Sequence, residues 1–368
     1  MIMQFLVGFT FIVLVQSVIY SLFAFRGFNY SCTLSHNRVN EGETIEYTET
    51  IENKRLLPLL WLKVEARFNE TLLFTKNDNT RVSAGTFHRS VLSMSPFRRI
   101  KRTYKIVCSK RGYYPLGSSS ITTGDLLGLT SRTMSFSSDM GLHVFPVPLL
   151  QTQIDLPSRS FLGDMVVRRY ILPDPFMPAG VRDYVPGDPQ NMIHWKASAK
   201  TGSLVVHRRE FTADSKLLVF FNVAFNARSW DINDTVVINT MENSLRILAT
   251  VFNLAASNGQ QTALCTNSIS FRDRSEVTVP PAYGRAHNEK LFSAMAEMQF
   301  IRTRSFHMLL REAVEEVRDM DILLVTRYIS AETQTEIEAL RLNGNKVEVF
   351  IIPEAAAEHL PDGGEQNG

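Results

Sequence analysis

The sequence has few cysteines, and they form no recognisable motif. Its 368 residues include only Cys32, Cys108 and Cys265, which lie far apart and make no C-x-x-C pair. This pattern gives no basis for a disulfide framework or for a zinc site built on paired cysteines. We therefore expect the three cysteines to behave as small buried hydrophobic residues.

The chain also lacks an excess of charge of either sign. It carries 39 basic and 37 acidic residues, a formal net charge of +2. A protein that binds nucleic acid mainly by neutralising phosphates is usually strongly basic, so this class is disfavoured. The composition of 44% hydrophobic and 21% charged residues is typical of globular domains. At about 150 residues per domain, the length allows two or three of them.

Sequence motifs for catalysis are missing as well. There is no G-x-G-x-x-G, G-x-x-x-x-G-K-[ST], H-E-x-x-H or G-x-S-x-G, and the eight histidines are scattered. Ser198 and Lys200 could be read as a serine–lysine pair, but polar surface or cap residues explain them better. Without a nucleophile, base and orienting group, we expect a protein that is not an enzyme and that has no cofactor.

What the sequence does have, first of all, is a long apolar run. The segment from Ile2 to Phe25 contains no charged residue and, as a helix, would cross a hydrocarbon core about 30 Å thick. A cleaved signal peptide would have a basic start and a shorter apolar core. We therefore predict a membrane anchor over residues 1–26. Arg26 and Arg38 follow the run, so the positive-inside bias places the soluble part in the cytoplasm.

Residues 27–147 show the period-two alternation of half-buried strands. Examples are the stretches 43–51 (ETIEYTETI) and 61–66 (WLKVEA), and turn signals separate such stretches. Several short strands without a helical period predict an antiparallel β-sandwich of the immunoglobulin-like kind.

Residues 148–215 lose regular periodicity and are rich in proline. The part after Gly180 mixes charged, aromatic and apolar residues too closely for a flexible tether, so we expect an ordered connecting element.

Residues 216–353 alternate buried β runs with helical periods, which predicts a doubly wound α/β domain with a mostly parallel sheet. Residues 354–368 have no periodicity and are expected to be disordered. The expected strands are 216–223, 261–265, 321–326 and 346–352, and the expected helices are 234–257, 286–298, 305–317 and 331–342.

The densest group of charged, aromatic and turn-forming residues lies at 180–200. Its turn, Pro186-Gly187-Asp188-Pro189, suits a rigid reversal of the chain. In one interpretation this segment is a docking surface formed by Arg182, Asp188, Trp195, Lys196, Arg208 and Arg209. In the other, Arg182 pairs with Asp188, Trp195 fills the seam between two domains and Lys196 lies along it. The packing interpretation is favoured because tryptophan is more often packed than exposed.

This segment resembles the signature of the bacterial family catalogued as domain of unknown function 58, written R-x-Y-x-P-G-D-x-x-x-x-I-x-W-K-x-x-A-[RK]-x-G-x-L. The stretches 111–117 (RGYYPLG) and 125–129 (DLLGL) look like the last sandwich strands of that family. The signature matches are Arg182, Tyr184, Pro186, Gly187, Asp188, Ile193, Trp195, Lys196, Ala199, Lys200, Gly202 and Leu204. The predicted motif residues are Arg182, Asp183, Tyr184, Pro186, Gly187, Asp188, Trp195, Lys196 and Lys200.

The resemblance implies a membrane anchor, a β-sandwich, the signature segment and a domain similar to von Willebrand factor type A. Members often carry two N-terminal helices, whereas one is visible here. The family also implies two partners, a MoxR-type AAA+ ATPase and a transglutaminase-like membrane protein.

A type A domain usually binds Mg²⁺ through D-x-S-x-S after its first strand, because a hard cation prefers carboxylate and hydroxyl oxygens. The matching positions here are Asn222, Ala224 and Asn226. Loss of the carboxylate and of one oxygen predicts a degenerate site without metal. A partner could still use this edge, since ligands favour the carboxyl ends of parallel strands.

The leading hypothesis is therefore a membrane-anchored, non-enzymatic adaptor for a MoxR-type ATPase. Residues near Asn222 and Asn226 would be its contact face, and Arg182, Asp188, Trp195 and Lys196 would fix the α/β domain on the sandwich. The alternative is an outward-facing scaffold or adhesin of the cell envelope, with the sandwich as its binding module. Membrane topology distinguishes the two.

Overall fold

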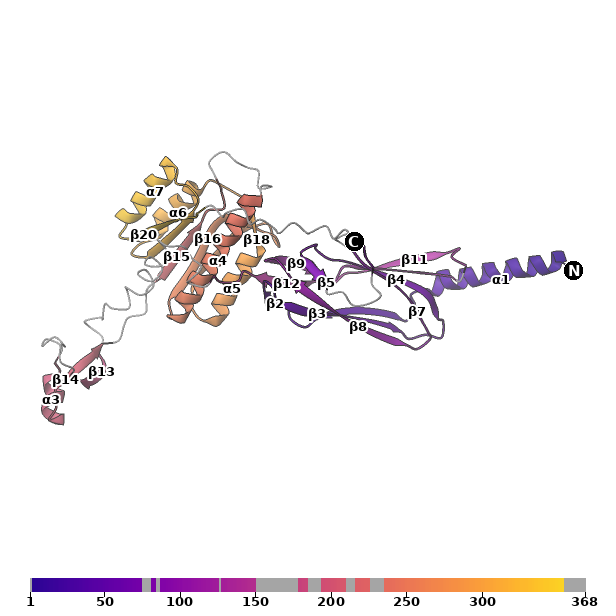
Figure 1. Ribbon diagram of the computed structural model, residues 1–368, viewed down its shortest axis with the longest axis horizontal. Coiled ribbons are helices and arrows are strands. Elements are labelled where there is room, and N and C mark those ends of the chain that lie inside the picture. Colours follow the sequence, from indigo (N-terminus) through magenta and orange to yellow (C-terminus); the bar gives the residue numbers. More distant parts are fainter. Residues whose placement is uncertain are drawn as a thin grey trace, which may run out of the picture. The chain divides into compact units, whose positions relative to one another are not determined.

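The computed structural model describes residues 2–74, 81–83, 87–125, 127–149, 178–184, 193–209, 216–225 and 235–353. The chain divides into two compact units, with the boundary between Val147 and Pro148 and with residues 295–297 grouped with the first unit (Figure 1). The predicted disordered tail, 354–368, and most of the proline-rich stretch lie outside the described residues.

The first unit is an apolar helix followed by antiparallel β-sheets. The sheets have the strand orders β1-β3-β8-β5, β11-β10-β4-β7-β6 and β2-β12-β9, and every pairing is antiparallel except β12 with β2. The elements are α1 (Ile2–Phe23), β1 (Phe28–Leu34), β2 (Arg38–Asn40), β3 (Thr44–Asn53), β4 (Leu59–Arg67), β5 (Leu72–Phe74), β6 (Arg81–Ser83), β7 (Phe87–Met94), β8 (Arg99–Cys108), β9 (Gly112–Leu116), β10 (Ser119–Gly124), β11 (Ser131–Phe136) and β12 (Met140–Phe145).

Alternating side chains of these strands fill two hydrophobic cores. Ile51, Leu62 and Ile121 belong to the core nearer α1, and Tyr47 and Ile106 belong to the second. Along β3, buried positions alternate with exposed or half-buried ones, as expected of a strand with one face toward a core. The prediction of antiparallel β-sheets is confirmed.

The three cysteines are free thiols. Cys108 is buried, whereas Cys32 and Cys265 are half-buried and pack against hydrophobic cores. Burial raises the pKa of the Cys265 thiol to about 11, which keeps it protonated at neutral pH. These thiols therefore serve packing, as expected.

One of the two stretches expected to be the last sandwich strands has a different structure. Residues 112–116 form β9, but Asp125 and residues 127–129 lie in the turn between β10 and β11. Two further strands, β11 and β12, follow that turn, so the prediction was wrong for 125–129. A turn fits its glycine, because Gly128 has a φ of 71°.

The helix α1 is long and apolar enough to cross a membrane, with a mean hydropathy of 2.2 over its best window. A signal sequence has the same properties. The last two turns of α1, however, carry polar residues on the face that lies against the sandwich. The hydrogen bonds run from Gln16 Nε2 to Asp125 Oδ2 (3.1 Å), from Ser17 Oγ to Thr130 Oγ1 (3.1 Å), from Tyr20 OH to the Pro58 carbonyl (2.9 Å) and from Arg132 Nη2 to Ser21 Oγ (3.1 Å).

The second unit contains a small hairpin and a mixed, mostly parallel α/β region. Its large sheet has the order β17-β16-β15-β19-β20, with β18 also paired to β16. The elements are β13 (Pro178–Asp183), α3 (Trp195–Thr201), β14 (Val205–Arg209), β15 (Lys216–Phe221), α4 (Thr235–Ser257), β16 (Gln261–Ser270), β17 (Glu276–Ala282), α5 (Arg285–Glu297), β18 (Met298–Arg302), α6 (Phe306–Glu316), β19 (Asp321–Thr326), α7 (Ala331–Leu342) and β20 (Lys346–Ile351).

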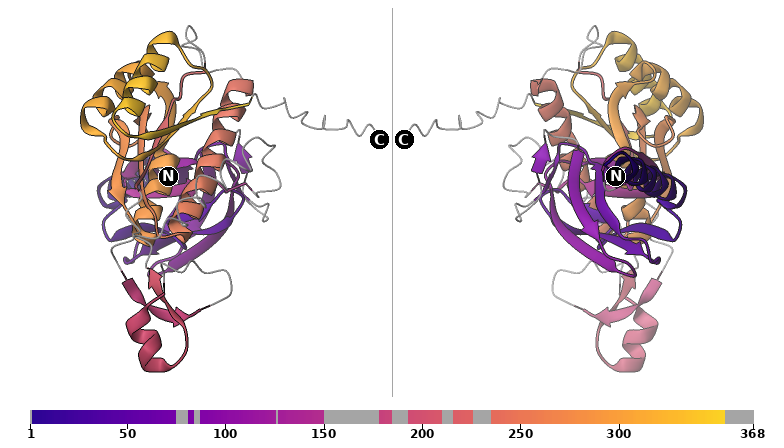
Figure 2. Two further views of the ribbon diagram at one scale, coloured as in Figure 1. Left: turned by 90° about the vertical axis from the view of Figure 1, so that its left-hand side faces the viewer. Right: turned by 90° about the vertical axis from the view of Figure 1, so that its right-hand side faces the viewer.

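Helices cover both faces of this sheet. Leu218 and Phe220 of β15 form a core with Leu310 of α6 and Leu340 of α7. The alternate residues of β15 point to the opposite face of the sheet. The helix α4 covers that face with buried side chains that run from Val237 to Ala255 and include Leu245. The views in Figure 2 show α4 on one side of the sheet and α6 and α7 on the other.

The four strands β16, β15, β19 and β20 are parallel, as the alternation of strands and helices predicts. The predicted helices are confirmed to within one residue at each end. Two strands were not predicted, β17 and β18, and both pair with β16 in the antiparallel sense. These two antiparallel strands make the sheet mixed.

Candidate functional site

The signature segment folds as a β-hairpin that carries a short helix. Strands β13 and β14 pair antiparallel, with Asp183 opposite Val205. The hairpin is extended by a hydrogen bond from the Tyr184 N–H to the Leu204 carbonyl (2.9 Å). An isolated bridge joins Ile193 to Val206, and both of these side chains are buried. The ordered element expected in this region is thus present.

Both ends of the helix α3 are capped. His194 precedes the helix, and its Nδ1 accepts a hydrogen bond from the Ala197 N–H (3.1 Å). Gly202 ends the helix in the left-handed conformation, at a φ of 72°, and its N–H donates to the Ser198 carbonyl. Gly202 is one of the signature residues, whereas His194 occupies a position that the signature leaves open.

Ser198 holds α3 against β14. Its hydroxyl accepts from the Val205 N–H (3.0 Å) and lies 3.1 Å from the His194 carbonyl, to which it can donate. The favoured interpretation of Ser198 and Lys200 as surface or cap residues fits Lys200, which is exposed. Ser198 instead joins α3 to β14 through its hydroxyl group. Ser198 and Val205 are seven residues apart, and the sequence alone does not show that they are in contact.

The outward side of α3 is formed by large and basic side chains. Trp195 is 67% exposed, and Lys196 and Lys200 are exposed as well. No residue of α3 is buried. The ring of Trp195 is therefore not packed within the hairpin that carries it, and its place in a seam between two domains stays a prediction.

Several predicted positions lie beyond what the structure describes. Asp183 is exposed and Tyr184 is half-buried. For Arg182 only the backbone, in β13, is described, and the same holds for Arg208 and Arg209 in β14. Pro186, Gly187, Asp188 and Asn226 lie outside the described residues, and so does the predicted pairing of Arg182 with Asp188.

Asn222 lies where predicted, directly after β15 at the carboxyl edge of the sheet, and it is 1% exposed. Its Nδ2 donates to Thr326 Oγ1 (3.0 Å), and its Oδ1 accepts from the Ala224 N–H (3.1 Å) and from Asn267 Nδ2 (3.0 Å). Asn267 in turn accepts from the Val223 N–H (3.0 Å). Three polar side chains from three adjacent strands thus form one buried network, which we call the amide network (Asn222, Asn267 and Thr326).

The amide network leaves little for a cation to bind. Both acceptor sites of Asn222 Oδ1 are used within the protein, and Ala224, itself buried, supplies no oxygen from its side chain. In the part of the chain that the structure describes, no group of three or more His, Cys, Asp or Glu side chains could hold a metal ion. The described residues at this edge therefore form a neutral, hydrogen-bonded network around Asn222.

Asn267 and Thr326 were missed in the sequence. The sequence predicted a strand that ends at residue 265, before Asn267, whereas β16 runs to Ser270 and includes it. The sequence shows the polar run Thr266-Asn267-Ser268 directly after an apolar strand, and the structure buries all three residues. Which polar residues meet depends on the lateral order of the strands, and this was not known.

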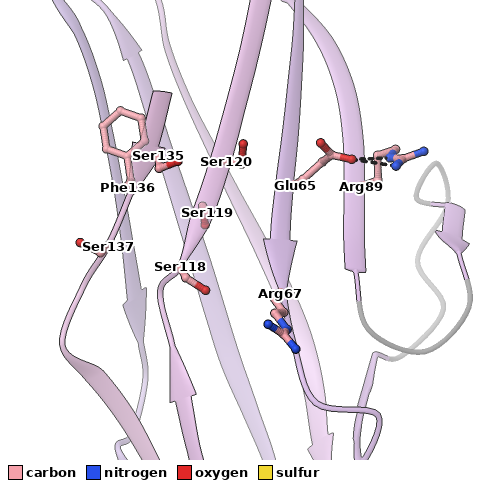
Figure 3. A pocket seen from close by; sticks show the side chains of 9 residues that line it. All are labelled: Glu65, Arg67, Arg89, Ser118, Ser119, Ser120, Ser135, Phe136 and Ser137. Carbon is pink, nitrogen blue, oxygen red and sulfur yellow. Dashed lines mark hydrogen bonds and ion pairs between the residues drawn. The ribbon is translucent and has the colours of Figure 1, made fainter. Parts of the chain in front are cut away.

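The first unit has a shallow pocket of about 400 Å³ on the β10–β11 side of the sandwich. Figure 3 shows serines on its walls and an ion pair between Glu65 and Arg89, with an oxygen to nitrogen distance of 2.8 Å. Hydrogen bonding to Lys63 and then to Arg89 lowers the pKa of Glu65, so this carboxylate is neutralised by its neighbours. The pocket therefore presents hydroxyl groups together with the exposed guanidinium of Arg67. It is lined by Glu65, Arg67, Arg89, Ser118, Ser119, Ser120, Ser135, Phe136 and Ser137.

The comparison with protein families gives one match. The model described as "Protein of unknown function DUF58" matches residues 180–367, about half of the chain. This range begins in the signature hairpin and includes the whole sheet with the amide network.

A relative is the uncharacterized protein YeaD of Bacillus subtilis (strain 168). It is 21% identical over 343 residues, which cover 92% of this chain and 79% of YeaD. The similarity is therefore longer than the family match and extends into the first unit.

Solved structures align with about a third of the chain. A cohesin module of a Clostridium perfringens family 33 glycoside hydrolase aligns with a TM-score of 0.24 and 16% identity, over 32% of this chain and 96% of the module. A CARDB domain from Pyrococcus furiosus aligns with a TM-score of 0.21 and 13% identity, over 33% of this chain and 96% of that domain.

Proposed function

The chain belongs to the DUF58 family of proteins of unknown function, and from this premise we propose that it is a membrane-anchored, non-enzymatic adaptor. Its proposed partner is a MoxR-type AAA+ ATPase, with a transglutaminase-like membrane protein as a further member of the assembly. In this proposal the sandwich is immunoglobulin-like and the second unit is a von Willebrand factor type A-like domain that has lost its metal.

The observation that carries the proposal is the exposure of Trp195 on the signature helix. A tryptophan ring in solvent leaves a large apolar surface without cover, and such surfaces are typical of protein interaction sites. Lys196 and Lys200 are four residues apart and therefore share one side of α3. An aromatic centre with a basic rim favours a partner whose surface is apolar at its centre and acidic around it.

The amide network supports the non-enzymatic part. Asn222 replaces the carboxylate that would hold a cation, and its oxygen is bonded to neighbouring groups. A neutral and fully hydrogen-bonded edge is rigid, which favours a surface that is recognised by shape over one that performs chemistry.

The contacts of α1 support the anchor. Asp125 is fully buried, and one of its oxygens accepts from Gln16 of the helix. Removal of α1 as a signal peptide would leave this carboxylate and the Pro58 carbonyl without the partners that α1 supplies, at a cost of about 1–3 kcal/mol for each group that stays buried. A helix that is retained avoids this cost.

Binding between the detergent-solubilised full-length protein and a purified MoxR-type ATPase tests the adaptor. We expect Trp195→Ala to weaken binding by about 30-fold, the effect of a hot-spot residue worth about 2 kcal/mol. Because Trp195 is exposed, its removal should leave the thermal unfolding of the protein unchanged.

The matched control is Leu342→Ala, which truncates an exposed apolar side chain at the end of α7 in the same unit. This variant should bind as the parent does. Equal binding by the Trp195→Ala protein would show that the signature helix is not the contact. Absence of any binding by the parent would sink the adaptor itself.

A further inference from the structure

The apolar surface of α1 continues past the point where the helix meets the sandwich. In the last two turns, Gln16, Ser17 and Tyr20 face the sandwich, while Val18, Ile19 and Leu22 are exposed. The whole of α1 rises about 33 Å at about 1.5 Å per residue, close to the thickness of a hydrocarbon core. A bilayer crossed by α1 therefore extends alongside these last two turns.

The polar side chains of these two helical turns are bonded to residues of the sandwich, and those residues must lie at the same depth in the membrane interface. An unpaired amide or hydroxyl in an apolar medium is costly. Gln16 and Ser17 avoid this cost through Asp125 and Thr130, which lie at the two ends of the β10–β11 turn. The turn therefore lies at the same depth as Gln16.

The outer surface of this turn is apolar. Leu129 is 61% exposed, and Leu127 is exposed as well. Inside the turn, Asp125 Oδ1 accepts from the Thr130 N–H (2.9 Å), so the polar groups point inward and the two leucines point outward. This arrangement is the reverse of that expected for a turn in water.

A second apolar pair lies at the end of α1. Arg55 donates a hydrogen bond to the Phe23 carbonyl, and the Phe97 N–H donates to the Arg55 carbonyl (3.2 Å). These bonds hold the β3–β4 and β7–β8 turns beside the helix. Leu56 and Phe97 at the tips of these two turns are exposed.

Most charges around these tips are basic, and Glu52, near the end of β3, is paired with Lys54 (3.4 Å). Arg132 bonds to Ser21 of α1, and Arg26 directly follows the helix, with its guanidinium over the Phe23 ring. Apart from the buried Asp125, the described residues of the three turns carry no acidic side chain. Basic residues close to an anionic leaflet are attracted to it. The basic residues at this end are Arg26, Lys54, Arg55, Arg98, Arg99 and Arg132.

We propose that this end of the sandwich is a membrane-contact surface for an anionic phospholipid bilayer. Leu127, Leu129, Leu56 and Phe97 enter the headgroup region beside α1, and the arginines bind lipid phosphates. The sandwich is thereby held by the membrane in a fixed orientation, and α1 is more than a flexible tether. The inference rests on the proposed anchoring by α1.

Site-specific photo-crosslinking in vesicles tests this surface. The full chain is prepared with p-benzoylphenylalanine at Leu129, or at Phe97, and reconstituted into vesicles of phosphatidylcholine and phosphatidylglycerol. After illumination, lipid adducts are measured by mass spectrometry. We expect several-fold more adduct at both positions than at Leu73, a 53% exposed residue of β5. Leu73 pairs with Val107 at one end of β8, whereas the other end of β8, at Arg99, lies beside α1. Leu73 is therefore a control position far from the proposed surface.

A probe at Phe9, an exposed residue within α1, separates the two proposals. Adduct at Phe9 but only background adduct at Leu129 and Phe97 would overturn the membrane-contact surface and leave the anchor standing. Background adduct at Phe9 as well would show that α1 is not in the bilayer, and both proposals would fall. All probe positions are exposed, and thermal unfolding of each variant checks that the chain is folded.

Discussion

At the scale of single residues, the side-chain amide of Asn222 joins neighbouring strands at the carboxyl edge of the sheet. A carboxylate at this position would need a cation or several donors to be stable in a buried site. The amide instead donates to Thr326 and accepts from Asn267 and the Ala224 N–H. The edge is thereby linked across three strands by neutral hydrogen bonds.

Glu49 is a second residue whose burial has a measurable effect. It is fully buried, its Oε1 accepts from Tyr30 (3.1 Å), and its Oε2 has no hydrogen-bond partner. Burial raises the pKa of this carboxyl group, although Tyr30 and Arg102 oppose the shift. The folded state therefore binds the proton more tightly than the unfolded state, so stability falls as the pH rises from the unfolded-state pKa through the folded-state pKa.

Glu49→Gln removes this ionisation, and we expect the variant to melt at a higher temperature than the parent at pH values above the folded-state pKa. A relief of about 1 kcal/mol corresponds to roughly 2–4 °C for a unit of this size. Below the unfolded-state pKa the two proteins should melt alike. The measurement is thermal unfolding of the detergent-solubilised full chain as a function of pH.

Glu46→Gln provides the control, since Glu46 lies on the same strand but is exposed. The two glutamates differ in burial and not in chemistry. If Glu49→Gln kept the pH profile of the parent, the burial of Glu49 would not be the source of the pH dependence.

At the scale of elements, the contact between α1 and the sandwich depends on Asp125. Its Oδ1 accepts from the Thr130 N–H and its Oδ2 from Gln16 Nε2. Asp125→Ala leaves both donors without their partner, and we expect a loss of about 1–3 kcal/mol in unfolding free energy. The loss should be accompanied by faster tryptic cleavage after Arg26, between the helix and the first strand.

Asp125→Asn is the conservative variant, because an amide still accepts from the Thr130 N–H and can bond to Gln16. It should lose less stability than Asp125→Ala. Asp139→Ala, at an exposed aspartate before β12, should behave as the parent. Equal stability of Asp125→Ala and the parent would contradict the role of this contact.

The elements that could be predicted from the sequence are those with a strong period. The helices α4 and α7 and the strand β19 have the predicted bounds to within a residue, because apolar side chains recur at the helical or strand period. Strand β17 was missed, since it contains Pro280 and Pro281, which cannot donate to a ladder and are typical of edge strands. Its place at the edge of the sheet explains how the two prolines are accommodated.

The candidate site was predicted only in part, for a related reason. Asn222 could be placed because it follows a buried strand directly. Its partners could not, because Asn267 and Thr326 meet it through the order in which β16, β15 and β19 lie side by side. The exposure of Trp195 was also not predictable, since a seven-residue helix has no apolar face to bury and shows no period.

At the scale of the whole molecule, the similarity to the relative covers more of the chain than the family match does. The DUF58 model matches from the signature hairpin onward, whereas the similarity to YeaD extends into the first unit. The proposed adaptor uses these parts differently: the helix and the sandwich fix the protein at the membrane, and the hairpin and the sheet edge meet the partner. Such a division requires that both soluble units lie on the side of the membrane where the partner is found.

Membrane topology is therefore the property on which the proposed function depends most. Arg26 and Arg38 follow α1 closely, and basic residues near a spanning helix favour the cytoplasmic side. We expect a C-terminal epitope tag to be protected from added protease in intact spheroplasts and to be lost after lysis, with a known cytoplasmic protein as the control. Loss of the tag from intact spheroplasts would place the sandwich and the α/β region outside. An ATPase that works in the cytoplasm could not then reach Trp195, and an envelope scaffold or adhesin would be the better account.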